Sequence, residues 1–179
     1  MKKILLLVIA VVMSLPSAFA QYKEDWALED IYLSKSNVTY QGELDLGYSL
    51  GVGTFAIGRV NIHTIHGAKI GKYFSTGLGV GIDLYTEGEG TDVMVTIYLN
   101  VKGFIPTNVS AKPYFSLDIG AGIGASKYIT GLSGMVLTPA IGVNVGLFKA
   151  QIGYHVQSIS MEGIGINMNS IQLKIGIML

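Results

Sequence analysis

The chain has no cysteine, only four prolines, and few charged residues for its 179 positions. The missing cysteine excludes disulfides and thiolate metal sites. Charged residues make up 13% of the chain, about half of their usual share in soluble domains. Because so few charges would cover the surface poorly, we expect much of it to face an apolar environment. The formal net charge is zero, so no nucleic acid partner is expected.

The first 20 residues have the pattern of a cleaved secretory signal peptide. Lys2 and Lys3 precede an apolar run over 4–13, and Ala18-Phe19-Ala20 fits the small-x-small cleavage rule. The apolar run is too short for a spanning helix, which needs about 20 residues. We therefore expect 1–20 to be removed. The charged stretch 21–37 would then form a periplasmic N-terminal segment, followed by a β-barrel domain over 38–179.

Apolar and polar residues alternate from residue 38 to the C-terminus. The alternation divides into eight segments, at 38–52, 56–67, 73–85, 93–105, 113–125, 135–147, 150–158 and 168–179. A period of two residues predicts β-strands, and each segment reaches the roughly 9–11 residues that cross a bilayer. Since an even number of antiparallel strands is typical of bacterial outer-membrane proteins, the pattern predicts an all-β fold, an eight-stranded antiparallel up-and-down transmembrane β-barrel.

The composition of the two strand faces decides which one points inward. The polar face is rich in glycine, serine, threonine and amides and carries few charges. It would make a poor solvent-exposed surface but would fill a narrow bore, since an eight-stranded barrel has room inside only for side chains. We therefore expect the apolar face to contact lipid. The inward glycines would leave room for Tyr73, Tyr98, Tyr114, Arg59 and Lys102.

Eight inward-facing polar residues are the candidate site residues. Because a buried charge is costly unless it is paired and hydrogen-bonded, we expect an interior polar network. Its members would be Glu43, Asp45, Arg59, His63, Asp83, Lys102, Asp118 and Lys174. The network could fill the lumen as a plug or line an ion path, and the narrow bore favours the plug.

The connections between the segments alternate between the two sides of the membrane. We expect periplasmic turns at 67–72, 106–112 and Phe148-Lys149, and extracellular loops at 52–55, 86–92, 125–134 and 160–166. Any extracellular partner, whose identity the sequence does not reveal, would bind these loops. Exposed aromatic residues form belts at membrane interfaces, and the candidates are Tyr40, Tyr48, Phe74, Phe104, Phe115, Phe148 and Tyr154.

The histidines do not form a catalytic or metal-binding pattern. His63 and His66 are three residues apart, which places them on opposite faces of a strand. His155 and Ser158 are separated in the same way. The glycine-rich stretch GLGVGIDLY lies inside an alternating strand without a following helix, unlike a dinucleotide-binding loop. We therefore expect no enzyme activity, no catalytic or metal site and no cofactor.

Several stretches resemble the small outer-membrane β-barrel proteins of the porin-like superfamily. They include YQGELDLGYSLGVG, KPYFSLDIGAGIG and the C-terminal IQLKIGIML. The last resembles the signal read by the barrel-assembly machinery, which the resemblance implies as a partner during biogenesis, although the chain ends in leucine rather than an aromatic residue. The residues that would carry this signal are Ile171, Leu173, Ile175, Ile177 and Leu179. The resemblance implies an eight-stranded barrel in the outer membrane and no shared catalytic residues.

These observations favour a monomeric outer-membrane barrel with a structural or interaction role in the bacterial envelope. It would contact outer-membrane lipid, and side chains would fill its lumen. A narrow porin-like channel for small solutes or ions is the first alternative. A soluble periplasmic ligand-binding barrel is the second.

Overall fold

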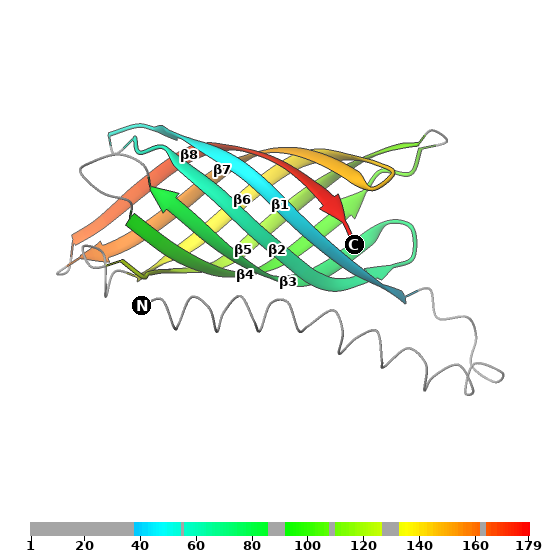
Figure 1. Ribbon diagram of the computed structural model, residues 1–179, viewed down its shortest axis with the longest axis horizontal. Coiled ribbons are helices and arrows are strands. Elements are labelled where there is room, and N and C mark those ends of the chain that lie inside the picture. Colours follow the sequence, from blue (N-terminus) through cyan, green and yellow to red (C-terminus); the bar gives the residue numbers. More distant parts are fainter. Residues whose placement is uncertain (1–37, 55, 86–91, 108–109, 127–132, 162–163) are drawn as a thin grey trace, which may run out of the picture. The chain divides into compact units, whose positions relative to one another are not determined.

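Eight antiparallel strands close into a barrel, as the alternation predicts. The computed structural model describes residues 38–54, 56–85, 92–107, 110–126, 133–161 and 164–179. Figure 1 shows the strands running obliquely around the barrel in sequence order, with β8 hydrogen-bonded to β1. Their bounds are β1 Val38–Val52, β2 Arg59–Ile70, β3 Phe74–Tyr85, β4 Asp92–Phe104, β5 Ala111–Gly124, β6 Ser133–Val145, β7 Phe148–Met161 and β8 Ile164–Met178. The expectations for residues 1–37 lie outside the described residues.

The seam between the first and last strands closes the barrel. The register of β1 and β8 runs from Glu43 opposite Met178 to Val52 opposite Asn169. Closure pairs the backbone groups that an open sheet would leave exposed at its edges. No helix in the described part of the chain has the length and apolar character that a transmembrane helix needs.

The barrel has a turn end and a loop end. The turn end carries the β2–β3, β4–β5 and β6–β7 connections together with the start of β1 and the end of β8. The other four connections lie at the loop end. The turn predicted at Phe148-Lys149 is wrong, because both residues belong to β7 and the turn is formed by Gly146 and Leu147. Gly146 has a φ of 60°, a conformation that glycine adopts without a steric cost.

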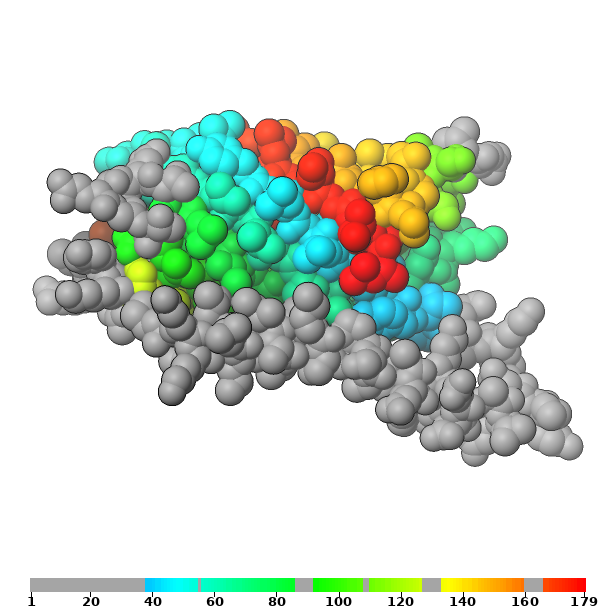
Figure 2. All heavy atoms as spheres, in the orientation of Figure 1, coloured from blue at the N-terminus to red at the C-terminus, as the bar shows by residue number. Residues whose placement is uncertain are grey.

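The two faces of the wall have the expected sidedness. Leu44 and Ile119, both outward, are 46% and 39% exposed, whereas Asp45 and Asp118, their neighbours in sequence, are 2% and 3% exposed. The outward side chains form the surface of the barrel drawn in Figure 2. The apolar residues therefore cover the outside, and the polar residues fill the bore, which is the reverse of a soluble protein.

Two aromatic residues lie on the opposite side from the one predicted. Tyr73, expected inside the bore, is 60% exposed because it belongs to the turn before β3. Phe104, expected in an outer aromatic belt, is buried, since it shares the inward face of β4 with Asn100 and Lys102. The other six belt candidates are exposed, namely Tyr40, Tyr48, Phe74, Phe115, Phe148 and Tyr154.

Candidate functional site: the polar bore and the outer wall

An ion-pair cluster crosses the bore near the turn end. The Nζ atoms of Lys102 and Lys149 both donate to the Glu43 carboxylate, and Lys149 Nζ lies 2.8 Å from Asp45 Oδ2. The four side chains come from β1, β4 and β7 and are at most 2% exposed. Two positive and two negative charges therefore meet in a region with little access to solvent, where each charge offsets the desolvation of its partner.

A second polar group occupies the middle of the bore. Lys174 Nζ lies 3.6 Å from Asp118 Oδ2 and 3.2 Å from His63 Nδ1. His63 Nε2 lies 3.2 Å from Asp83 Oδ1, and the Tyr98 hydroxyl lies 3.1 Å from His63 Nδ1. These residues come from β2, β3, β4, β5 and β8, so the interactions span the bore rather than link neighbouring strands alone.

Arg59 occupies the bore near the loop end. Its Nη1 donates to the Tyr85 hydroxyl and to Gln157 Oε1, both at 2.8 Å, and its Nη2 donates to Ser170 Oγ at 3.1 Å. An apolar cluster adjoins this group: Tyr85, Met94 and Ile159, with Ile57 and Met168 packed against them. Side chains thus cross the bore at three levels, and the apolar cluster lies beside the Arg59 group at the loop end.

Glycines make room for the large residues of the bore. A Cβ atom added at Gly79 would lie 2.3 Å from two Tyr98 ring carbons, and one added at Gly142 would lie 2.4 Å from a Tyr114 ring carbon. Real Cβ atoms do not approach other atoms so closely, so the tyrosine rings occupy the space left by the missing side chains. This complementarity fills the narrow lumen.

The structure brings all eight candidate site residues into the bore. Each is at most 4% exposed. They form three groups rather than one continuous chain of contacts: Glu43, Asp45 and Lys102; His63, Asp83, Asp118 and Lys174; and Arg59.

The sequence prediction missed Lys149, which completes the turn-end cluster. The alternating segment predicted from the sequence begins at residue 150, which leaves Lys149 in the preceding turn. The signal was nevertheless present, since Gln151, Gly153 and His155 define the polar face of this strand, and the same spacing extended by one step reaches Lys149.

A chain of hydrogen bonds lies on the outward face of β1 and β2. The Tyr40 hydroxyl lies 2.6 Å from His66 Nδ1, and Thr64 Oγ1 lies 3.0 Å from His66 Nε2. Thr64 Oγ1 donates its only proton to the backbone carbonyl of Glu43. In the neutral imidazole, Nε2 must therefore donate to Thr64, and Nδ1 must accept from Tyr40. This direction prevents His66 from acting as a base towards Thr64.

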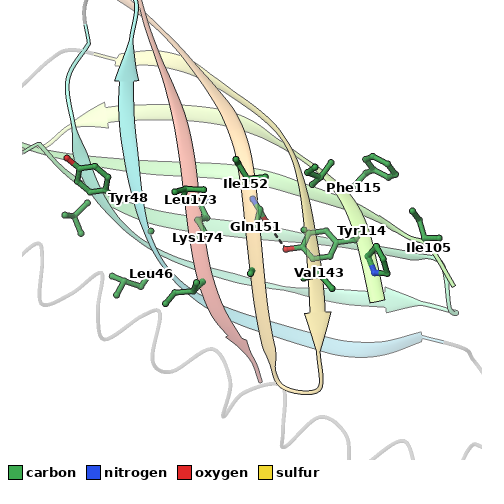
Figure 3. A pocket seen from close by; sticks show the side chains of 17 residues that line it. Leu46, Tyr48, Ile105, Tyr114, Phe115, Val143, Gln151, Ile152, Leu173 and Lys174 are labelled. Atoms are coloured by element: carbon green, nitrogen blue, oxygen red, sulfur yellow. Dashed lines mark hydrogen bonds between the residues drawn. The ribbon is translucent and has the colours of Figure 1, made fainter. Parts of the chain in front are cut away.

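A hollow on the outer wall is lined by residues of β1, β2 and β5–β8 and by Ile105 of the β4–β5 connection. The side chains around it that point outward are apolar or aromatic, including Leu46, Phe115 and Ile152. Figure 3 shows Tyr114 and Gln151, which are buried in the bore, joined by a hydrogen bond of 3.1 Å. Among the described residues no group of three histidine, cysteine or acidic side chains could hold a metal ion.

Comparisons with known proteins find similarity in fold only. No family model and no curated protein matches the chain. Among solved structures, Neisserial surface protein A matches with a TM-score of 0.58 and 13% identity, covering 79% of this chain and 97% of that one. The outer membrane enzyme PagL matches with a TM-score of 0.58 and 10% identity, covering 75% and 98% of the two chains. The chain thus has the fold of small outer-membrane barrels, as the sequence resemblance implies.

Proposed function

We propose that the protein is exported to the outer membrane of a Gram-negative bacterium, where it spans the bilayer as a monomeric barrel with a filled bore. The turn end would face the periplasm and the loop end the exterior. Its role would be structural, or it would bind a partner through the loops. One observation carries the proposal: an apolar outer wall surrounds a bore that ion pairs and hydrogen bonds cross at three levels.

Membrane location is tested by fractionation combined with heat-modifiable gel migration. We expect the mature protein in the outer-membrane fraction, running as a compact band in detergent until it is boiled. This expectation follows from the exposed leucine and isoleucine side chains of the outer wall, which would aggregate in water. Recovery of the protein in the soluble periplasmic fraction without detergent would support the soluble ligand-binding barrel instead.

The filled bore is tested by conductance across a planar lipid bilayer. We expect no stable currents from the purified protein, because the side chains of Glu43, Lys102 and Lys149 meet across the lumen. A variant with Tyr98, Lys102 and Lys149 replaced by alanine provides the matched opened barrel, once heat-modifiable migration shows that it is folded. Stable single-channel currents from the unmodified protein would overturn the filled-bore proposal.

A narrow channel is the second candidate, and buried polar atoms in the bore favour it. Arg59 Nε, Asp83 Oδ2, His155 Nε2 and Gln172 Oε1 have no hydrogen-bond partner among the described residues. Buried polar groups usually bind protein or water, so these atoms would suit a hydrated path. The conductance measurement separates the two candidates, since a continuous hydrated path carries ions and a plug does not.

We further propose that the barrel is not an enzyme and uses no cofactor. The support comes from the outward chain of Tyr40, His66 and Thr64, whose hydrogen bonds run in the direction that leaves the threonine without a base. Mass spectrometry of membrane lipids from cells that express the protein should match that of cells lacking it. A lipid change that depends on His66 would contradict this proposal.

A further inference from the structure

We propose that the rim of the turn end binds the phosphate headgroups of anionic phospholipids through Lys69, Lys72 and Lys112. This inference rests on the proposed membrane location and orientation of the barrel, which would place the rim at the periplasmic leaflet. The inference adds a lipid-binding site at the rim to a barrel whose filled bore has a structural role in the proposed function.

None of the three lysines pairs with a carboxylate among the residues that the structure describes. The structure shows no ion pair to Lys69, Lys72 or Lys112 from any acidic side chain it describes. Glu43 and Asp45, the acidic members of the turn-end cluster, are already paired with buried lysines. An external anion is therefore the natural partner of the rim.

Aromatic rings separate the rim from the ion pairs inside the bore. Lys69 Nζ lies 5.1 Å from the centroid of the Phe104 ring, and this ring packs against Tyr114 at 5.7 Å. Lys102 Nζ lies on the inner side, 5.4 Å from the Tyr114 ring. Lys69 and Lys112 also repel one another electrostatically. The rings thus hold Lys69 near the mouth, where a single phosphate could reduce the repulsion between both ammonium groups.

The position of the rim along the barrel fits a bilayer interface. The hydrogen-bonded Tyr40 and His66 place two polar groups on the outward faces of β1 and β2. Lys69 follows His66 by three residues, or about 10 Å along the strand, and Lys72 lies in the turn between β2 and β3. Exposed Tyr73 and Phe74 come next in the chain, and such aromatic residues collect at the headgroup level.

The neighbouring wall favours a lipid over a soluble anion. Lys112 precedes Pro113, and the apolar hollow of the outer wall includes Pro113, Ile105 and Phe115. The Ile105 amide donates to the Pro113 carbonyl at 2.9 Å, which holds the end of β4 beside the start of β5. A phospholipid could therefore place its phosphate at the rim while its acyl chain lies on continuous apolar surface.

The experiment is native mass spectrometry of the full barrel in detergent with added phosphatidylglycerol or phosphatidylcholine of identical acyl chains. We expect preferential retention of phosphatidylglycerol. We expect Lys69→Gln/Lys72→Gln/Lys112→Gln to reduce that retention roughly tenfold or more, while Lys127→Gln, at a position between β5 and β6 in the sequence, leaves it unchanged. The triple variant should keep its heat-modifiable migration.

Three outcomes would overturn the proposal. These are equal retention of the two lipids, undiminished retention by the triple variant, and displacement of phosphatidylglycerol by inorganic phosphate, which would show a site for a free anion. Failure of the membrane location itself would be seen independently, in the fractionation of the unmodified protein.

Discussion

Lys149, the second residue of β7, donates to Glu43 of β1, which lies 106 positions earlier in the chain. The same carboxylate accepts from Lys102 of β4. The Glu43 side chain therefore connects β1, β4 and β7, no two of which are neighbours in the sheet. Only closure of the wall brings them together, and this relationship identifies Glu43 as the centre of the turn-end cluster.

Replacing Glu43 by glutamine should destabilise the barrel strongly. The substitution removes the shared counter-charge and leaves Lys102 without an ionised partner in a nearly solvent-free region. Breaking a buried ion pair costs about 3–5 kcal/mol, so we expect a loss of that order in the free energy of unfolding, measured by urea titration in lipid vesicles. Asp92→Asn, at the loop end, should change it by less than about 1 kcal/mol, and equal stability of the two variants would contradict the central role of Glu43.

A charge on the outer wall should be costly in proportion to its depth. Leu99 is exposed in the middle of β4, and Ile70 is exposed at the turn end of β2. We expect Leu99→Arg to lower the free energy of unfolding in vesicles by about 2–4 kcal/mol, and Ile70→Arg by about 0–1 kcal/mol. Equal costs at both positions would be inconsistent with a bilayer around the barrel.

The contact between Gly79 and Tyr98 should not tolerate a methyl group. Because the added Cβ would lie 2.3 Å from the tyrosine ring, Gly79→Ala should cost about 1–3 kcal/mol in unfolding free energy. The control is Gly103→Ala, where nothing lies within 4 Å of the added atom. Combining Gly79→Ala with Tyr98→Leu should recover part of the loss, and an unfolding titration in which the smaller residue recovers nothing would refute this account of the packing.

The hydroxyl of Tyr40 should contribute to the junction of β1 and β2. Tyr40→Phe removes the hydrogen bond to His66 Nδ1, so we expect a loss of about 0.5–1.5 kcal/mol in unfolding free energy. Tyr154 is similarly exposed, at 45% against 43% for Tyr40, and the structure describes no hydrogen bond to its hydroxyl. Tyr154→Phe is thus the matched control, and a similar loss from both variants would exclude a specific role for the Tyr40–His66 contact.

The alternation of apolar and polar residues is enough to predict eight strands and the side that most residues within them face. A strand places successive side chains on opposite faces, so a period of two residues directly separates Leu44 and Ile119 from Asp45 and Asp118. The wrong predictions arise at strand ends, where the alternation rule was not extended to the last residues. Phe104 and Lys149 both lie on the inward face of their strands. The sequence prediction nevertheless places Phe104 in the outer belt and Lys149 in a turn.

Which inward residues meet depends on the closed barrel as a whole. Alternation gives a side chain its face but not its height along the barrel axis, because height depends on the register of all the strands between two partners and on the closure of β8 against β1. For this reason the sequence does not predict that Glu43 pairs with Lys102 and Lys149, or that Arg59 lies apart from them. Nor does it predict that Lys69 lies against the Phe104 ring. Non-local contacts across the bore are a property of the closed barrel.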